Sequence, residues 1–244
     1  MFEMPSRRRI YLMRHGEAAY VSADGVVTDN PTQVPLTATG RQQAETQGRV
    51  LADIAFDRAV CSGLPRTVET AGLVLAQSNH PVPRLEQVPQ LEEIHGMKGE
   101  RQWPPQSGQS VAEVIADIAN PWAHGAKPNA TFLGGEPFRD FDARVAAEWE
   151  NLIADEHWQS LLLVLHGGVN RTLFNHMIGL DWRGDLCIEQ DNCCINIIDV
   201  DDTEPRRYLI RGVNITAYNL SKDGIVLTNM EATAKRVADT LSSL

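Results

Sequence analysis

Long hydrophobic runs and clusters of positive charge are what this sequence lacks. No stretch approaches the roughly 18 consecutive apolar residues that a membrane helix needs, and no signal-peptide-like apolar segment precedes Ile10. Asp and Glu outnumber Lys and Arg by 32 to 22, for a formal net charge of −10, whereas a surface that binds nucleic acid or anionic lipid is basic. We therefore expect a soluble cytoplasmic protein with no nucleic-acid or membrane partner. An anionic small substrate stays possible, since a few arginines in one cleft reverse the local potential.

Cysteine is also scarce. The chain has 4 cysteines in 244 residues, and two of them, Cys193 and Cys194, are adjacent. Their spacing fits neither a disulfide framework nor a C-x-x-C pair. We therefore predict reduced thiols, as is usual for proteins of reducing compartments.

The composition is that of an ordinary globular domain, with 43% hydrophobic and 22% charged residues. Short apolar runs predict strands at 10–13, 58–62, 161–165, 194–200 and 207–213. Amphipathic stretches predict helices at 38–54, with Thr37 as N-cap, and at 65–76, 138–155, 169–177 and 231–241. Alternating strands and helices imply right-handed crossovers. We expect a single α/β domain over residues 1–244, with a mostly parallel central sheet and helices on both faces.

Residues 80–136 break the regular pattern. They are rich in Pro, Gly, Gln, Ser and Asn, with one short helical stretch at about 110–119. Long irregular segments inside α/β domains are often lids over a site. We expect an inserted cap here, because this segment could hardly supply a hydrophobic core of its own.

Reactive polar residues follow three of the predicted strands. They are Arg14 and His15 after the first strand, Ser62 and Arg66 after the second, and His166, Gly167 and Gly168 after the strand at 161–165. Parallel sheets bind ligands outside the carboxyl ends of their strands. Arginine offers a planar fork for two phosphate oxygens, and a glycine-rich helix start presents free N–H groups to an anion. A neutral imidazole whose other nitrogen is held as N–H can act as a nucleophile.

Each of these signals has a simpler explanation when it is taken alone. A single histidine beside a strand is more often a surface or capping residue, and two histidines could be metal ligands. The carboxylate or cysteine spacing of a zinc motif is absent, so we expect neither a metal nor a cofactor. Recurrence at three strand ends favours phosphoryl transfer.

Several sequence blocks resemble the histidine phosphatase superfamily, also called the phosphoglycerate mutase-like family. They are Arg14-His15-Gly16-Glu17, the P-L-T-A-T-G-R-Q-Q-A run at 35–44, Ser62 to Arg66 followed by Thr70 and Ala71, the strand leading into His166-Gly167-Gly168, and Arg211 to Asn214. The resemblance spans about residues 10–214.

The resemblance implies specific roles. His15 is the nucleophile that becomes phosphohistidine. Arg14, Arg66 and His166 form the phosphate pocket, with the backbone N–H of Gly167 as a helper. The family's proton donor is a glutamate, for which Glu93 fits the motif better than Glu92.

The sequence departs from the family pattern in the rim of the pocket. Ala18 and Val21 stand where many members carry Thr and a phosphate-binding Asn. Ser22 and Asn30 are candidates to replace that Asn. His95 adjoins the candidate acid and is a further possible site residue.

Three functions remain open at this stage. The favoured one is a phosphomonoesterase that hydrolyses small phosphorylated metabolites. The alternatives are a phosphoglycerate mutase-type isomerase and an inactive relative that binds phosphorylated ligands. Neither the substrate nor the oligomeric state follows from these residues.

Overall fold

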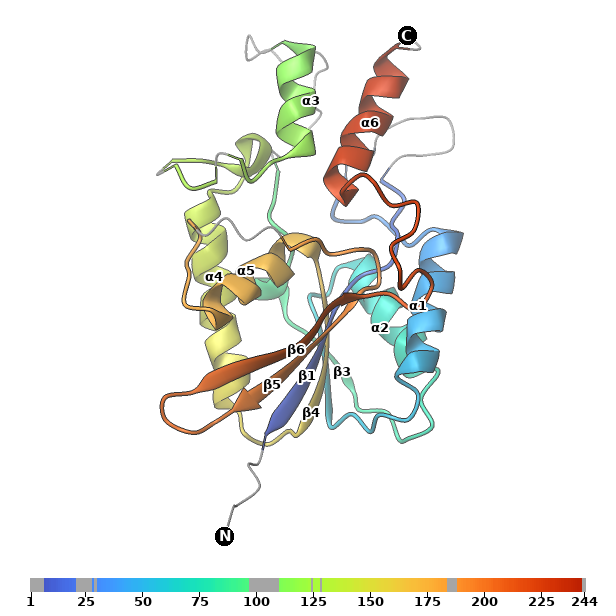
Figure 1. The fold of residues 1–244 in the computed structure, drawn as a ribbon, viewed down its shortest axis with the longest axis vertical. Coiled ribbons are helices and arrows are strands. Elements are labelled where there is room, and N and C mark those ends of the chain that lie inside the picture. The colour runs from blue at the N-terminus through green and yellow to red at the C-terminus, as the bar shows by residue number, and fades with distance from the viewer. Residues whose placement is uncertain are drawn as a thin grey trace.

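A single mixed sheet forms the centre of the molecule (Figure 1). The computed structural model describes residues 7–20, 28, 30–96, 110–123, 125–127, 129–183 and 188–242. Within them, six strands lie in the order β3-β2-β4-β1-β5-β6. Their bounds are Arg8–Arg14 (β1), Arg58–Cys61 (β2), Leu85–Gln87 (β3), Ser160–Leu165 (β4), Ile195–Asp201 (β5) and Arg207–Ile215 (β6).

The central strands are apolar on both faces, as the sequence predicted. In β1, Ile10 and Leu12 point to one core, whereas Tyr11 and Met13 point to the other, because successive side chains of a strand alternate between its faces. Strand β4 divides its five apolar residues in the same way. Each face of the sheet therefore needs its own cover of helices.

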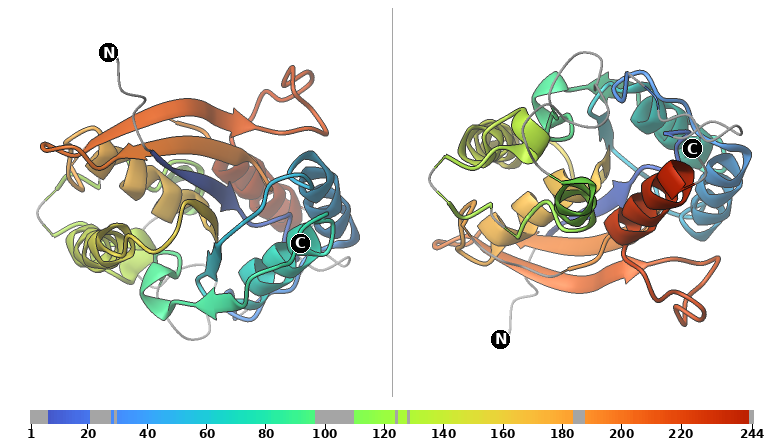
Figure 2. Two further views of the ribbon diagram at one scale, coloured as in Figure 1. Left: turned by 90° about the horizontal axis from the view of Figure 1, so that it is seen from below. Right: turned by 90° about the horizontal axis from the view of Figure 1, so that it is seen from above.

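Two pairs of helices supply that cover (Figure 2). Helices α4 (Phe138–Ala154) and α5 (Gly167–Met177) pack on the first core. Helices α1 (Ala38–Val50) and α2 (Pro65–Leu75) pack on the second. The predicted α/β class with helices on both faces is confirmed.

The helix starts follow local sequence signals. Thr37 caps α1 as predicted, with its side chain accepting a hydrogen bond from the Gly40 N–H. Pro65 occupies the first turn of α2, where its missing N–H has no intrahelical partner to lose. Helix α5 begins directly at Gly167, two residues before the predicted start.

Three of the five strand pairings among the described residues are parallel, as the predicted mostly parallel sheet requires, and the other two are antiparallel. Strand β4 pairs in parallel with β1 and β2, and β2 pairs in parallel with β3. Strand β5 is antiparallel to both β1 and β6. The link from β5 to β6 spans only residues 202–206, which is too short for a parallel crossover.

Residues 80–136 are more regular than the sequence indicated. They contain the edge strand β3 and the short 3₁₀ turns η1 (Pro89–Leu91) and η2 (Phe132–Gly134). A three-residue strand is too short for alternation to reveal it, and it forms because β2 offers a free edge. The expected helix is present as α3 (Val111–Ala119), with a capping box between Ser110 and Glu113.

Helix α3 does not stand alone above the sheet. It packs along the C-terminal helix α6 (Asn229–Ser242), and both project beyond the same end of the sheet (Figures 1 and 2). Ile118 of α3 and Ala234 of α6 are buried. More than 100 residues separate the two helices in sequence, and no local pattern predicted their pairing. None of the helices among the described residues has the length and apolar character needed to cross a membrane.

Candidate active site

The reactive residues follow three neighbouring strands. Strand β4 lies between β2 and β1, with Arg14 opposite Leu165 and Cys61 opposite Val164. The carboxyl ends of all three strands therefore meet at one edge. The structure brings together the residues predicted from those ends, namely Arg14, His15, Ser62, Arg66, His166 and Gly167.

His15 is buried and its ring orientation is fixed. Its Nδ1 lies 2.7 Å from the Gly16 carbonyl oxygen, so Nδ1 donates and Nε2 keeps the lone pair. Burial, together with the positive charges of Arg66 and Arg14, holds the pKa of His15 well below the usual value of 6.5. The ring is therefore neutral at physiological pH, as a nitrogen nucleophile requires.

A chain of hydroxyl groups assigns the proton on His166. The Thr67 hydroxyl donates to the Leu64 carbonyl at 2.8 Å, so it accepts from Ser62 at 3.0 Å. Ser62 then accepts from His166 Nε2 at 2.8 Å. Nε2 consequently carries the proton, which leaves Nδ1 buried without a partner among the described residues.

The two histidine rings lie close together. Their centroids are 5.2 Å apart, in an edge-to-face arrangement. The pKa of His166 is also far below its usual range, through burial first and then through the positive charges of the two arginines, of which Arg66 has the larger effect. Two neutral imidazoles and two guanidinium groups therefore form the site.

Each of the two arginines, Arg14 and Arg66, uses one N–H group to bind the protein backbone and has a buried Nε that is unpaired among the described residues. Arg14 Nη1 donates to the Gln190 carbonyl at 2.6 Å, and Arg66 Nη1 donates to the Pro31 carbonyl at 3.0 Å. The Nε of each is buried with no partner in the described part of the chain. Unpaired buried donors are costly unless something binds them. The Nε donors of Arg14 and Arg66 therefore fit an oxyanion such as phosphate.

The glycine of the Arg-His-Gly block is required by a close approach between two segments. A Cβ on Gly16 would lie 2.6 Å from the Gly40 carbonyl oxygen, and a Cβ on Gly40 would collide with the Glu17 carbonyl. The start of α1 thus packs directly against the loop after β1. Glu17 joins this contact through a 2.7 Å hydrogen bond from the Thr37 hydroxyl.

The Glu93 carboxylate, from the loop after η1, lies against the N-terminal end of α5, next to Gly168. Its Oε2 accepts the Gly168 N–H at 3.0 Å, and a Cβ on Gly168 would collide with its Oε1. The same Cβ would lie 3.1 Å from a ring carbon of Trp122. Gly168 is therefore needed so that a carboxylate and an aromatic ring can approach the helix start next to His166.

Glu92 is placed differently. Its carboxylate lies 3.5 Å from His95 Nε2, and both side chains are half-buried. Of the two glutamates, Glu93 is the one hydrogen-bonded to the helix start that follows His166. His95 lies against Glu92 and is also joined to Glu136, just before α4. Its backbone N–H donates to the Glu136 carboxylate at 3.1 Å, and its carbonyl accepts the Glu136 N–H at 2.7 Å.

Arg144 of α4 binds the loop that carries both glutamates, and no sequence motif pointed to this residue. Its guanidinium donates to the carbonyls of Gln90, Glu92 and Glu93 and pairs with the Glu136 carboxylate at 2.7 Å. Its partners are mostly backbone atoms far away in sequence, so no motif records them.

The sequence offered Asn30 and Ser22 as replacements for the family's phosphate-binding asparagine, and the structure describes only the first of them. Asn30 is exposed, and its side-chain oxygen accepts from Thr32, while the contact with Arg66 comes from the carbonyl of the next residue, Pro31. Ser22 lies outside the described residues. The segment before α1 thus reaches the site through a backbone atom.

Burial disfavours the reactive thiolate form of the cysteines that the structure describes. Cys61, Cys193 and Cys194 are free and buried, whereas Cys187 lies outside the described residues. Burial raises the pKa of Cys194 to about 12, which keeps it a thiol. Among the described residues, no three His, Cys, Asp or Glu side chains come close enough to bind a metal ion.

Comparison with known proteins agrees with this geometry. Residues 10–211 match the model of the histidine phosphatase superfamily (branch 1). Adenosylcobalamin/alpha-ribazole phosphatase of Escherichia coli K12 is 32% identical over 194 residues, which cover 79% of this chain and 90% of that protein. A 2,3-bisphosphoglycerate-dependent phosphoglycerate mutase of Rhizobium etli is 30% identical over 192 residues, covering 74% and 85%.

A solved structure shows the same fold. The crystal structure of the alpha-ribazole phosphatase from Shigella flexneri superposes with a TM-score of 0.65 at 31% identity, covering 84% of this chain and 96% of that one. Together with the family match over 10–211, this likeness assigns the chain. The protein belongs to the histidine phosphatase superfamily.

Proposed function

We propose that this protein is a phosphomonoesterase that hydrolyses small phosphorylated metabolites through a phosphohistidine on His15. The observation that carries the proposal is the neutral His15 ring, with its Nε2 lone pair free, beside the unpaired buried Nε donors of Arg14 and Arg66. That combination supplies a nucleophile and a receptor for the oxygens of the group it attacks. The similarity to phosphatases supports the same reaction.

In the first step, His15 Nε2 attacks phosphorus. The N–P bond forms as the bond from phosphorus to the ester oxygen breaks, and the acid form of Glu93 gives its proton to the leaving oxygen. In the second step a water molecule attacks phosphorus and gives a proton to the Glu93 carboxylate. The N–P bond breaks, His15 is regenerated and inorganic phosphate leaves.

The remaining groups stabilise charge. The Nε groups of Arg14 and Arg66 bind equatorial oxygens as negative charge is redistributed in the transition state. A bound phosphate places negative charge beside His166 Nδ1, which favours a proton there and so adds a further donor. The N-terminal end of α5 contributes the positive end of its dipole, with the Gly167 N–H as a helper. These donors supply the positive charge that a metal ion provides in other phosphatases, so we propose a reaction without metal or cofactor in a cytoplasmic enzyme.

The alternative of a phosphoglycerate mutase keeps support from the Rhizobium etli relative. A mutase excludes water while a bisphosphorylated intermediate reorients, which calls for a closed basic cap. Residues 80–136 contain four basic and seven acidic residues. We therefore favour hydrolysis, and we propose that this segment is the cap.

The test of function is the fate of the phosphoryl group. Incubation with 3-phosphoglycerate and catalytic 2,3-bisphosphoglycerate should give no 2-phosphoglycerate, or a trace of it. A panel of sugar phosphates and nucleoside-type phosphomonoesters, with alpha-ribazole phosphate included, should release inorganic phosphate from at least one member in the presence of EDTA. Fast 2-phosphoglycerate formation without phosphate release would promote the isomerase. Loss of activity in EDTA, restored by Mg²⁺ or Zn²⁺, would contradict the metal-free reaction.

The proton donor can be identified from its dependence on the leaving group. Glu93→Gln should slow phosphorylation of the enzyme by on the order of 10²-fold for an alkyl phosphate. An activated aryl phosphate should be hardly affected, because its leaving oxygen needs little protonation. Glu92→Gln is the matched control, since it changes the neighbouring carboxylate that pairs with His95. If Glu92→Gln shows the selective loss and Glu93→Gln does not, the assignment of the acid is wrong.

A further inference from the structure

The first residue of α6 touches the same atom that orients Arg14. The Asn229 Nδ2 lies 3.2 Å from the Gln190 carbonyl oxygen, and Arg14 Nη1 lies 2.6 Å from that oxygen. A carbonyl oxygen has two lone pairs and can accept both donors. Helix α6 and the phosphate-binding arginine therefore share one acceptor.

A second contact anchors the start of α6 at the same place. The Glu189 carboxylate accepts from the Asn229 backbone N–H at 3.2 Å and from its Nδ2 at 2.9 Å. A carboxylate at a helix N-terminus satisfies an otherwise unpaired N–H group and is favoured by the helix dipole. The other oxygen of Glu189 binds Arg171 at 2.9 Å, and the Arg171 guanidinium lies over the ring of Trp122.

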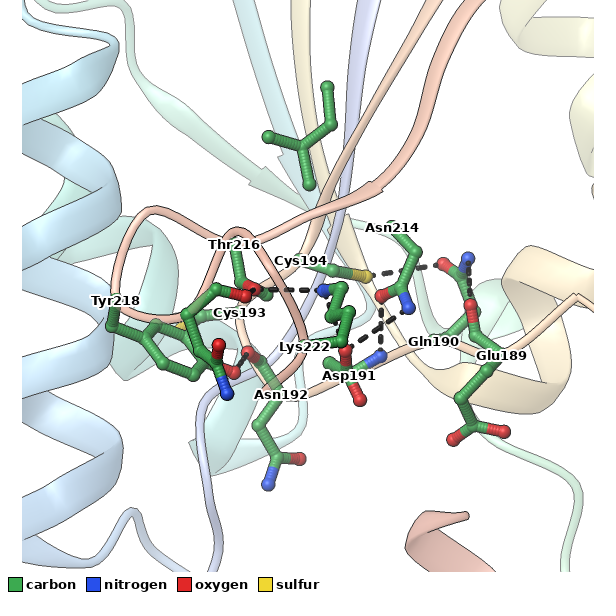
Figure 3. A network of polar contacts seen from close by, with 12 residues as sticks. Glu189, Gln190, Asp191, Asn192, Cys193, Cys194, Asn214, Thr216, Tyr218 and Lys222 are labelled. Carbon is green, nitrogen blue, oxygen red and sulfur yellow. Dashed lines mark hydrogen bonds and ion pairs between the residues drawn. The ribbon is translucent and has the colours of Figure 1, made fainter. Parts of the chain in front are cut away.

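The Gln190 carbonyl belongs to a segment that several hydrogen bonds and an ion pair hold in place (Figure 3). The Gln190 side chain is buried and exchanges hydrogen bonds with Asn196. The next residue, Asp191, binds Asn214 and the Lys222 ammonium group, the latter at 2.7 Å. Figure 3 shows this network of side chains converging on residues 190–191. The carbonyl of Gln190 is therefore a fixed point against which two partners are oriented.

We propose that Asn229 is a positioning residue that couples the seating of α6 to the orientation of Arg14 for phosphate binding. The inference rests on the proposed role of Arg14. Helix α6 lies outside residues 10–211 and packs along α3, so the coupling joins the predicted cap to the phosphate pocket. With Asn229 in place, Arg14 Nη1 stays on Gln190 and its Nε remains available to the ligand.

A double-mutant cycle on the binding of inorganic phosphate tests this coupling. Asn229→Asp removes both side-chain donors and places a carboxylate against Glu189 and the Gln190 carbonyl. It should weaken phosphate binding, measured by calorimetry, by on the order of tenfold, within the usual range for coupled sites. In an Arg14→Ala background, where Arg66 and His166 still bind phosphate weakly, Asn229→Asp should weaken binding no further, because Asn229 acts through Arg14.

The same coupling predicts a reciprocal effect on α6. Phosphate binding should slow amide hydrogen exchange in α6 of the wild-type protein, and this protection should be lost in Asn229→Asp. Lys235→Ala is the matched control, because Lys235 is an exposed residue of the same helix that pairs with Asp239. It should behave like the wild type in both measurements. If Asn229→Asp unfolds the protein, Asn229→Ala replaces it in the cycle.

The outcomes separate this inference from the proposed function. Unchanged phosphate affinity in Asn229→Asp, or an equal loss in the Arg14→Ala background, would overturn the positioning role even in an active phosphatase. A protein that binds phosphate in the predicted way but hydrolyses no ester would overturn the phosphatase and leave the coupling intact.

Discussion

Replacement of His15 by alanine is expected to abolish turnover, with a loss on the order of 10³-fold or more in kcat, because the covalent route has no other nucleophile. We do not expect His166 to take its place, because its Nε2 carries a proton bonded to Ser62 and a bound phosphate favours a second proton on its Nδ1. Rapid-quench experiments with ³²P-labelled substrate should detect an acid-labile, base-stable phosphoryl group on His15 in the wild type. The label should be absent in the variant.

His157→Ala is a suitable control for this experiment. Its side chain is 97% exposed and pairs with Asp155 at the opposite end of the sheet, so both turnover and labelling should match the wild type. Full activity of His15→Ala, or a stable label on another residue, would contradict the mechanism.

Arg66→Ala is expected to reduce kcat/KM by on the order of 10²-fold or more, and Arg14→Ala should act similarly. Each guanidinium is a permanent cation with an unpaired buried Nε beside the nucleophile, where charge is poorly screened. The loss should appear in kcat as well as in KM, since these groups stabilise charge that changes in the transition state. Steady-state kinetics with a good and a poor leaving group measure both parameters.

Arg183→Ala controls for the loss of a surface arginine, because Arg183 is exposed and pairs with Asp181. Its kinetics should not differ from the wild type. A change confined to KM in Arg14→Ala and Arg66→Ala would mean that both arginines bind only the ground state. They would then have no part in the chemical step.

Local sequence predicted most of the elements that bear the site. The apolar runs that became β1, β2 and β4 end in Arg14, Ser62 and His166, and parallel pairing alone was enough to expect these ends together. The helix cap Thr37 could be predicted because it depends on contacts within four residues. These features are encoded in periodicity and turn chemistry.

Contacts between segments that are far apart in the chain could not be predicted from the sequence. The acidic loop allowed both Glu92 and Glu93, and only tertiary packing, with Arg144 on the loop backbone and Gly168 at the helix start, decided which carboxylate meets α5. The short edge strand β3 was missed for a related reason. Three residues carry too little pattern, and the strand exists because β2 presents a free edge.

The sequence by itself therefore determined which reactive groups meet at one edge of the sheet: two histidines and two arginines after three strands, with glycines where backbone segments approach closely. The tertiary structure decided how those groups are held. It made β5 and β6 antiparallel, placed α6 against α3, and joined Arg14 to Asn229 through one carbonyl. The physical reason is the sequence separation of the residues that make each contact. A strand or a helix cap is specified by neighbours in sequence, whereas a shared acceptor between residues 14, 190 and 229 exists only once the whole sheet has folded.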